Sequence, residues 1–151
     1  MDLTRPNTIT SASAMQAIDG LQVELANLPQ VDCPLVHRFT PGLYVREIFM
    51  PRGTFIVSKV HKTEHPYTIS KGRVAVWTEA DGVLQLTAPF TGVTKPGTRR
   101  LLFIHEDCVW TTYHPTKETD LAKIEDAIID PRPLLGTLSR EAVTKLLEVT
   151  V

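Results

Sequence analysis

The chain has 151 residues, of which 42% are hydrophobic and 22% charged, and its formal net charge is −1. These values are typical of one globular domain with a hydrophobic core, and the balanced charge argues against nucleic acid or an anionic membrane as a partner. No apolar run approaches the roughly 20 residues of a membrane-spanning helix, and the N-terminal residues lack the pattern of a secretion signal. We therefore expect a cytoplasmic location, in which the two cysteines, Cys33 and Cys108, are reduced thiols.

The first predicted element is a helix over residues 10–28, with Thr10 or Ser11 as its N-cap. Apolar residues recur at helical spacing up to Leu28, and Pro29 ends the pattern. Gly20 destabilises this helix by about 1 kcal/mol relative to alanine. We expect residues 1–33 to form an N-terminal helical arm.

The segment from Pro34 to His114 changes to the pattern of short β-strands. Runs rich in Val, Ile, Thr and aromatic residues are separated by turn residues such as Lys71-Gly72, and Asp81-Gly82 is the clearest hairpin signal. The runs are PLVHRF, LYVREIFM, TFIVSKVH, YTIS, RVAVWTE, VLQLTA, RRLLFIH and CVWTTYH. Eight strands at this spacing predict an antiparallel sandwich or barrel, which we place at residues 34–116.

The last part of the chain, residues 117–151, becomes helical again. Thr119-Asp120 can cap a helix in LAKIEDAII, which Pro131 and Pro133 stop, and Ser139 can cap a last helix. The predicted fold is therefore mainly β, one structural domain with an N-terminal helix and C-terminal helices. Helices that flank a β core can cover a sheet edge or pack on a partner subunit.

His61 and His65 lie four residues apart in KVHKTEHPYTISKG, which is the spacing a helix uses to direct two ligands to one metal. A helix is excluded here, because the apolar residues 55–57 favour a strand and Pro66 disfavours the α conformation at His65. HKTEH also lacks the HExxH order of helical zinc sites. We place His61 at the end of a strand and His65 in the bend after it, with Lys59 and His61 on the same strand face.

This stretch resembles the first motif of the cupins, a superfamily of small jelly-roll barrels. In that motif a glycine precedes a strand with His-x-His, which is followed by a glutamate and a second glycine. Gly53 and Gly72 match the two glycines, His61 matches the second histidine, and His65 stands where the glutamate is expected. Lys59 replaces the first histidine. The resemblance implies a jelly-roll β-barrel and, because cupins are usually dimeric, a homodimer.

KPGTRRLLFI resembles a shortened second cupin motif, in which a Pro-x-Gly turn precedes a histidine. Pro96-Gly97 supplies the turn, and Arg100 stands at the position of the histidine. The chain also resembles small cupin-like proteins of tailed bacteriophages and prophages, through FTPGLYVREIFMPRGT, KVHKTEHPYTISKG, APFTGVTKPGTRR and TTYHPTKETDLAKIE. That group has no settled activity. The resemblance implies the host-cell cytoplasm or the virion as the location, and a phage or host protein as a partner.

His114 is predicted to replace the missing ligand. A turn at Glu106-Asp107 would pair RRLLFIH with CVWTTYH and place His114 opposite Arg99 or Arg100, about 5 Å away. With His61 and His65, His114 would supply three neutral imidazoles to a divalent ion such as Zn, Fe, Mn or Ni, leaving positions open for water or substrate. The alternative is that these histidines are hydrogen-bonded residues at the rim of the barrel. We expect the other two histidines, at positions 37 and 105, at the surface or rim.

Lys59 would repel a metal ion unless burial made it neutral or a carboxylate paired with it. Glu47 and Glu64 are the candidate partners, and Glu47 and Lys59 are also the candidate catalytic residues. For the glutamates, a salt bridge to a neighbouring cation is the alternative to a role as general base. In a third interpretation no metal binds, and Lys59 belongs to a basic pocket.

That pocket would contain Lys59, Arg99 and Arg100 and would bind a carboxylate, a phosphate or a sugar acid. Strand alternation predicts that at least one of the two arginines points outward. Tyr67 is the candidate for stacking on a ligand.

The sequence thus supports two functions. The first is the binding of a divalent metal, a small anionic ligand or both at the mouth of the barrel, with or without catalysis. The second is a non-catalytic phage accessory or virion protein, in which helices and strand edges make protein contacts.

Overall fold

The computed structural model describes residues 31–130, which belong to one compact unit of residues 30–132. The helix predicted over residues 10–28 and the helix predicted from Ser139 lie outside the described residues. No helix in the described part is long and apolar enough to cross a membrane. Cys33 and Cys108 are free thiols, as predicted, and burial raises the pKa of Cys108 to about 11.

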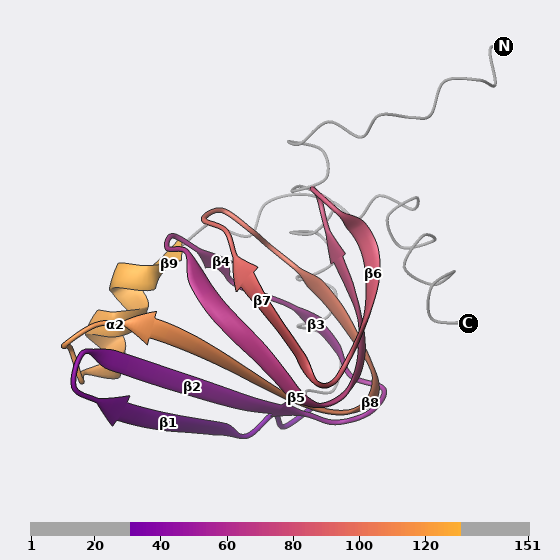
Figure 1. Cartoon of the computed structure of the whole chain (residues 1–151), viewed down its shortest axis with the longest axis horizontal. Coiled ribbons are helices and arrows are strands. Elements are labelled where there is room, and N and C mark those ends of the chain that lie inside the picture. The colour runs from indigo at the N-terminus through magenta and orange to yellow at the C-terminus, as the bar shows by residue number, and fades with distance from the viewer. Residues whose placement is uncertain (1–30, 131–151) are drawn as a thin grey trace, which may run out of the picture. The chain divides into compact units, whose positions relative to one another are not determined.

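The described residues form nine strands and one helix (Figure 1). The elements are β1 (Leu35–Thr40), β2 (Leu43–Met50), β3 (Phe55–Val57), β4 (Val60–His61), β5 (His65–Thr78), β6 (Gly82–Thr87), β7 (Phe90–Thr94), β8 (Leu101–Pro115), α2 (Leu121–Ile128) and β9 (Ile129–Asp130). Seven strands make one antiparallel sheet in the order β1-β2-β8-β5-β6, with β3 paired to β8 and β7 paired to β5. Strands β4 and β9 form a separate two-stranded sheet. The prediction of a mainly β, antiparallel fold is confirmed.

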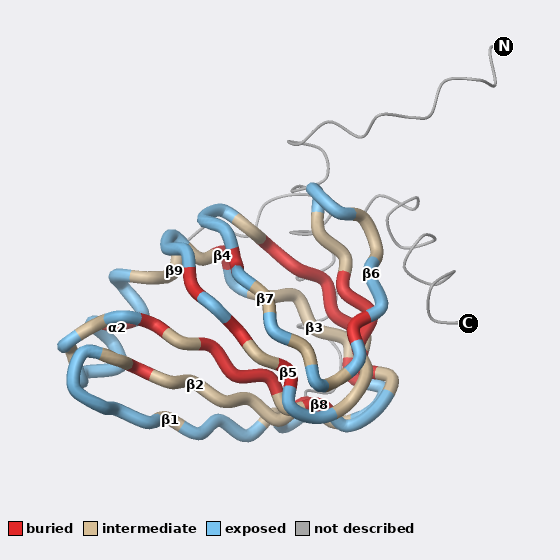
Figure 2. Tube along the Cα trace, viewed as in Figure 1, coloured by how far each residue is buried: buried red, intermediate tan, exposed pale blue. Residues whose placement is uncertain are grey.

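The sheet does not close into a barrel within residues 31–130, which corrects the prediction of a closed jelly-roll. Strand β1 pairs only with β2, and the two-residue strand β4 pairs with β9 instead of joining the large sheet. Figure 2 shows β1 exposed over most of its length and β2 mostly intermediate, whereas the longer buried segments run along β5 and β8. The predicted run TFIVSKVH is split into β3 and β4, and β7 was not predicted at all.

Two long strands, β5 and β8, form the centre of the sheet, and each contains two of the predicted runs. The predicted turn at Glu106-Asp107 is wrong, because β8 continues through it, and the hairpin that would have placed His114 opposite Arg99 or Arg100 does not exist. The turn expected at Lys71-Gly72 is likewise a bulge in β5.

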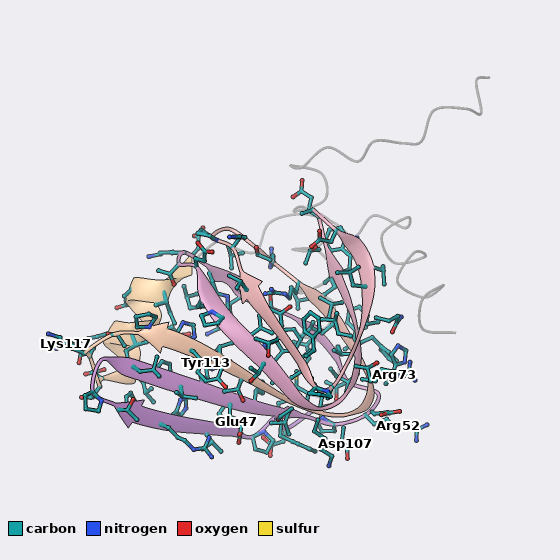
Figure 3. All side chains as sticks on the ribbon, in the orientation of Figure 1. Glu47, Arg52, Arg73, Asp107, Tyr113 and Lys117 are labelled. Carbon is teal, nitrogen blue, oxygen red and sulfur yellow. The ribbon has the colours of Figure 1, made fainter. Side chains whose placement is uncertain are left out.

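The glycine at this bulge explains why the signals resembled turns. Gly72 has a φ of +98°, and a Cβ there would lie 2.4 Å from the backbone oxygen of Asp107. Only glycine permits this conformation together with such a close approach of two backbones. Arg52 donates its backbone N–H to a carboxylate oxygen of Asp107 at 2.9 Å, and both residues are labelled at this end of the sheet, with Arg73, in Figure 3. The two long strands therefore bend together at this point.

The hydrophobic core lies on the concave side of the bent sheet, around the β5–β8 pair. Its most deeply buried side chains come from several strands. They are Met50, Ile69, Val74, Ile104 and Cys108. Apolar contacts of this kind contribute most of the stability of a domain of this size.

Helix α2 begins where the sequence predicts. The Asp120 side chain accepts hydrogen bonds from the backbone N–H groups of Ala122 and Lys123, which makes it the N-cap. The helix ends at Ile128, and the chain extends into β9, which pairs with the strand that carries His61. Figure 1 shows α2 beside the end of β8. The helix therefore belongs to the histidine end of the fold.

Candidate functional site

A cavity of about 510 Å³ lies between the concave face of the sheet and α2. This volume is within the range of small-molecule sites. Apolar side chains make up much of its wall, and the polar exceptions carry the chemistry. The polar and ionisable residues that line it are His37, Tyr44, Arg46, Ser58, Lys59, His61, His65, Thr94, Arg100, Thr112, His114 and Glu125.

Strand alternation decides which residues reach this cavity. On β2 the even-numbered residues from Tyr44 to Met50 line it, and on β8 Trp110, Thr112 and His114 do so. The residues between them face the other way, including Glu47 and Tyr113, which are labelled in Figure 3. Glu47 is thereby removed from the site.

Three histidines from three strands meet in the cavity: His61 from β4, His65 from β5 and His114 from β8. Their ring centroids are 4.5 Å apart for His61 and His65, 4.4 Å for His65 and His114, and 6.0 Å for His61 and His114. Strands β5 and β8 pair Tyr67 with Thr112, and the same offset two residues further places His65 opposite His114. The structure brings together the three histidines that the sequence interpretation grouped, although the neighbour of His114 is His65 and not an arginine.

Each of the three rings has one buried nitrogen with no hydrogen-bond partner: Nδ1 of His61, Nε2 of His65 and Nδ1 of His114. The other nitrogen is held by an oxygen in two of them. Nδ1 of His65 lies 3.0 Å from the backbone oxygen of Thr63, and Nε2 of His114 lies 3.0 Å from the hydroxyl of Thr112. An oxygen partner on one nitrogen is what orients a metal-binding histidine, since it leaves the other nitrogen aimed at the ion.

All three imidazoles are neutral at pH 7. Burial, and then the neighbouring His65 and His114, lower the pKa of His61 to about 3. Burial and then His65 lower the pKa of His114 to about 4, and burial also lowers the pKa of His65. Neutral imidazole is the form that binds metals.

The donor types of these residues suit a metal ion, but the donors are not arranged around a common point. Three imidazoles around one zinc-like ion with Zn–N distances of about 2.0–2.1 Å have ring centres roughly 4.5–5.5 Å apart. The His61–His65 and His65–His114 spacings of 4.5 and 4.4 Å are close to this range, whereas the His61–His114 spacing of 6.0 Å exceeds it. Among residues 31–130, however, no group of three or more His, Cys, Asp or Glu side chains has its donors arranged to hold an ion. Binding therefore requires the imidazoles to rotate toward a common point.

The predicted partners of Lys59 are wrong. Lys59 pairs with Glu125 of α2, at the solvent-exposed edge of the cavity. Glu47 pairs with Arg38 at 3.5 Å, and Glu64 pairs with Lys95 at 2.6 Å. The salt-bridge alternative for the two glutamates is thus observed, with other partners than expected, and neither glutamate lines the cavity. The burial that the neutral alternative requires is not observed, because more than half of the Lys59 side chain is exposed.

Arg100 lines the cavity and Arg99 does not, as alternation predicts for one of the two. The expectation that the outward residue is solvated is wrong, because both side chains are buried. Arg100 donates from Nη2 to the hydroxyl of Thr94 at 3.0 Å, and its guanidinium lies 5.0 Å from the ring centre of Tyr67. Tyr67 is buried beneath Arg100 and does not reach the cavity, so it supports the arginine and cannot stack directly on a ligand there.

Sequence reasoning missed Arg46, His37 and the α2 residues of the site. Arg46 follows Tyr44 at strand spacing, and that alternation was the available signal, but it did not show which face of β2 is buried. His37, expected at the surface or rim, lines the cavity, and its Nδ1 lies 2.6 Å from the hydroxyl oxygen of Tyr44. The positions of Ile124 and Ile128 over the cavity depend on the path of the chain after β8.

Comparisons with known proteins identify the fold. No family model and no curated protein sequence matches the chain. A solved structure of an uncharacterised protein with a double-stranded β-helix domain from Klebsiella pneumoniae is similar over 65% of this chain and 90% of its own, with a TM-score of 0.50 and 17% identity. Salicylate 1,2-dioxygenase from Pseudoaminobacter salicylatoxidans is similar over 80% of this chain, with a TM-score of 0.51 and 11% identity.

This chain covers 36% of the dioxygenase. A cupin family protein from Methanocaldococcus jannaschii is also similar over 60% of this chain and 88% of its own, with a TM-score of 0.46 and 12% identity. Similarity at this level of identity shows a shared fold and no shared activity. The described residues therefore have a double-stranded β-helix fold.

Proposed function

We propose that the protein binds a divalent transition metal through His61, His65 and His114, and a small organic ligand in the cavity beside it. The observation that carries the proposal is the set of three unpartnered, buried ring nitrogens in one cavity. Buried polar atoms without partners are rare in folded proteins, because each costs roughly 1–3 kcal/mol. A shared ion would provide a partner for all three.

The donor set restricts the metal. Three imidazoles suit Zn, Fe, Mn or Ni and leave positions free for water or ligand, whereas Ca and Mg prefer oxygen donors. Such an ion, when bound, polarises a carbonyl group or lowers the pKa of a water molecule. The chain's own contribution is to orient the imidazoles through Thr63 and Thr112, and to surround the site with apolar walls that limit the access of water.

Metal analysis of the purified full chain tests the proposal. After incubation with Zn, Fe, Mn or Ni and removal of excess ion, we expect about one ion per chain by mass spectrometry of the metals. The matched variants are the double change His61→Ala and His65→Ala, which should lose the ion, and His105→Ala, which should keep it because His105 lies outside the cavity. Failure to retain any of the four ions would contradict the proposal.

A second proposal concerns assembly, for which the cupin resemblance implies a homodimer. Edge strand β1 exposes Leu35, Val36 and Phe39, each by 40% or more, next to Val31 at 54%. Within residues 31–130 the outer edge of β1 has no partner strand, and such an apolar edge favours pairing with another chain. Light scattering coupled to size exclusion should give twice the mass of the chain, and Val36→Lys should give the monomer. A wild-type monomer at all concentrations would overturn this proposal.

The phage connection rests on the sequence resemblance alone, and we propose it as the genetic context of a cavity-binding protein. Mass spectrometry of purified particles from a phage that encodes the chain distinguishes a virion component from a protein of the infected host cytoplasm.

A further inference from the structure

We infer that the ligand of this cavity is a small monocarboxylate with an apolar body, and that Arg46 and Arg100 bind its carboxylate. This inference deepens the proposed function, since it names the class of ligand that occupies the cavity beside the three histidines. It rests on three observations: an excess of positive charge, a fixed guanidinium and a mainly apolar wall.

The cavity has more cations than carboxylates. Lys59, Arg46 and Arg100 line it, and Glu125 is the one carboxylate among the described lining residues. Glu125 pairs with Lys59, so that pair is neutral overall. Within residues 31–130 neither arginine forms an ion pair with a carboxylate. A partly buried guanidinium without a counter-ion is costly, and an anionic ligand would remove that cost.

Both arginines line the same cavity as the histidine cluster. Arg100 donates to Thr94, which lies opposite His65 in the pairing of β5 with β7. Arg46 lies opposite Thr112, whose hydroxyl contacts His114. We expect one small ligand in this cavity to contact both guanidinium groups. A divalent ion held by three neutral imidazoles near two arginines is also favoured by an anion, so metal and carboxylate should each strengthen the binding of the other.

Arg100 is held in place before any ligand arrives. Its guanidinium is 5.0 Å from the ring centre of Tyr67 and 5.7 Å from that of Trp110, and these two rings stack on each other with centroids 4.6 Å apart. Thr94 fixes one Nη2 hydrogen bond, while the group has five N–H donors in all. A fixed guanidinium loses little entropy when it binds a carboxylate in a bidentate manner.

The apolar residues that line the cavity favour a ligand with an apolar body. Ile48 and Met50 from β2, Leu102 from β8, and Ile124 and Ile128 from α2 line the cavity. A phosphate or a sugar acid would place several polar groups against these side chains without partners, which weakens binding. A monocarboxylate with an aliphatic chain or a single aromatic ring leaves no such group unpaired.

Calorimetric titration of the full chain, first stripped of metal with EDTA, tests the inference. Benzoate and hexanoate are the probes, benzamide and hexanamide are neutral controls of the same shape, and acetate and inorganic phosphate supply charge without an apolar body. We expect benzoate or hexanoate to bind about 10- to 100-fold more tightly than its amide, acetate or phosphate, as loss of a charge-assisted hydrogen bond implies.

Two variants test whether Arg46 and Arg100 bind the carboxylate. Arg46→Gln should weaken carboxylate binding about 10-fold or more and leave amide binding unchanged, and Arg100→Gln should do the same. The matched control is Arg38→Gln, on neighbouring β1 and outside the cavity, which should bind like the wild type. If Arg100→Gln does not fold, the ligand series on the wild type and the half-buried Arg46 still decide the question.

The outcomes separate this inference from the metal proposal. Three results would overturn the inferred ligand class even if zinc binds. They are equal binding of acid and amide, tighter binding of phosphate than of the acids, and no binding of either acid with or without zinc. If the metal-free chain binds carboxylates but the protein retains no metal, the result supports the inferred ligand class and contradicts the metal proposal.

Discussion

The two halves of the β5–β8 pair bury different kinds of side chain. In the half that contains the bend, the buried residues are apolar, with Val74 and Ile104 fully inaccessible. In the other half, His65 and His114 are almost as deeply buried, at 1% and 2% exposure, and each has a nitrogen without a partner. The same two strands thus supply a stable core at one end and costly polar groups at the other. Natural sequences retain such a cost mainly where it serves function, so the three unpartnered nitrogens in one cavity support the proposed site, although Nε2 of His105 in the other half also lacks a partner.

The largest effect is expected at the bend of the two strands. Gly72→Ala places a Cβ against the backbone of Asp107 at a φ that alanine rarely adopts. Since neither backbone can move without breaking the sheet, we expect a loss of at least about 2 kcal/mol in the free energy of unfolding. Urea denaturation measures this value. Gly82→Ala is the control, since it shares the positive φ but has no atom within 4 Å.

A truncation in the apolar half comes next. Ile104→Ala removes a fully buried side chain and leaves a cavity, so the free energy of unfolding should fall by about 2–5 kcal/mol. Zinc binding by the folded fraction should be retained, because Ile104 does not line the histidine cavity. A variant that kept its stability but lost zinc would contradict the proposal that one half of the β5–β8 pair stabilises the fold and the other half binds metal.

The corresponding change in the polar half should have the opposite outcome. His65→Leu replaces a buried imidazole by an apolar side chain of similar size, and it releases the backbone oxygen of the exposed Thr63 to water. We expect the metal-free protein to change by less than about 1.5 kcal/mol, or to become more stable. Metal binding should be lost. A destabilisation as large as that of Ile104→Ala would mean that His65 serves the core.

The pH dependence of stability distinguishes the two halves without mutation. The folded pKa values of about 3 for His61 and about 4 for His114 lie below the value of roughly 6.5 in the unfolded chain. Below pH 6.5 the unfolded chain therefore binds protons that the folded chain does not. Stability should be fully present above pH 6.5 and should fall as the pH decreases toward 4. Melting temperatures of the metal-free protein between pH 7 and 4.5 measure this, and the decrease should be smaller for His61→Gln.

The smallest effect is expected at the exposed edge of the cavity. Removing the Lys59–Glu125 ion pair with Glu125→Gln should cost about 0–1 kcal/mol, because both side chains are more than half exposed. The loss should diminish in high salt. Thermal melts at low and high salt measure it, and a salt-independent loss of more than 2 kcal/mol would show that the pair is essential to the position of α2.

The sequence grouped His61, His65 and His114, and the structure brings the three into one cavity. The grouping of His61 and His65 rested on the resemblance to the first cupin motif, and that of His114 rested on a predicted hairpin. The route to His114 was wrong, since Glu106-Asp107 and Lys71-Gly72 have the composition of turns but lie at bends within strands. Local propensity does not distinguish a turn from a bulge when a partner strand completes the hydrogen bonds.

Residues that depend on tertiary structure were the ones missed. Arg46 alternates with core residues along β2, and only the packing of the sheet shows that its face is the concave one. Glu125 and Ile124 reach the cavity because α2 is followed by β9, which pairs with β4 more than 60 residues earlier in the chain. Pairing over such a separation leaves no local pattern in the sequence.

The most direct test of the account is a crystal structure of the zinc-soaked protein with anomalous diffraction measured at the zinc edge. The account predicts one anomalous peak in the cavity, about 2.0–2.1 Å from Nδ1 of His61, Nε2 of His65 and Nδ1 of His114, the nitrogens that lack partners. A map with no peak among the three imidazoles, from protein exposed to zinc at neutral pH, would contradict it.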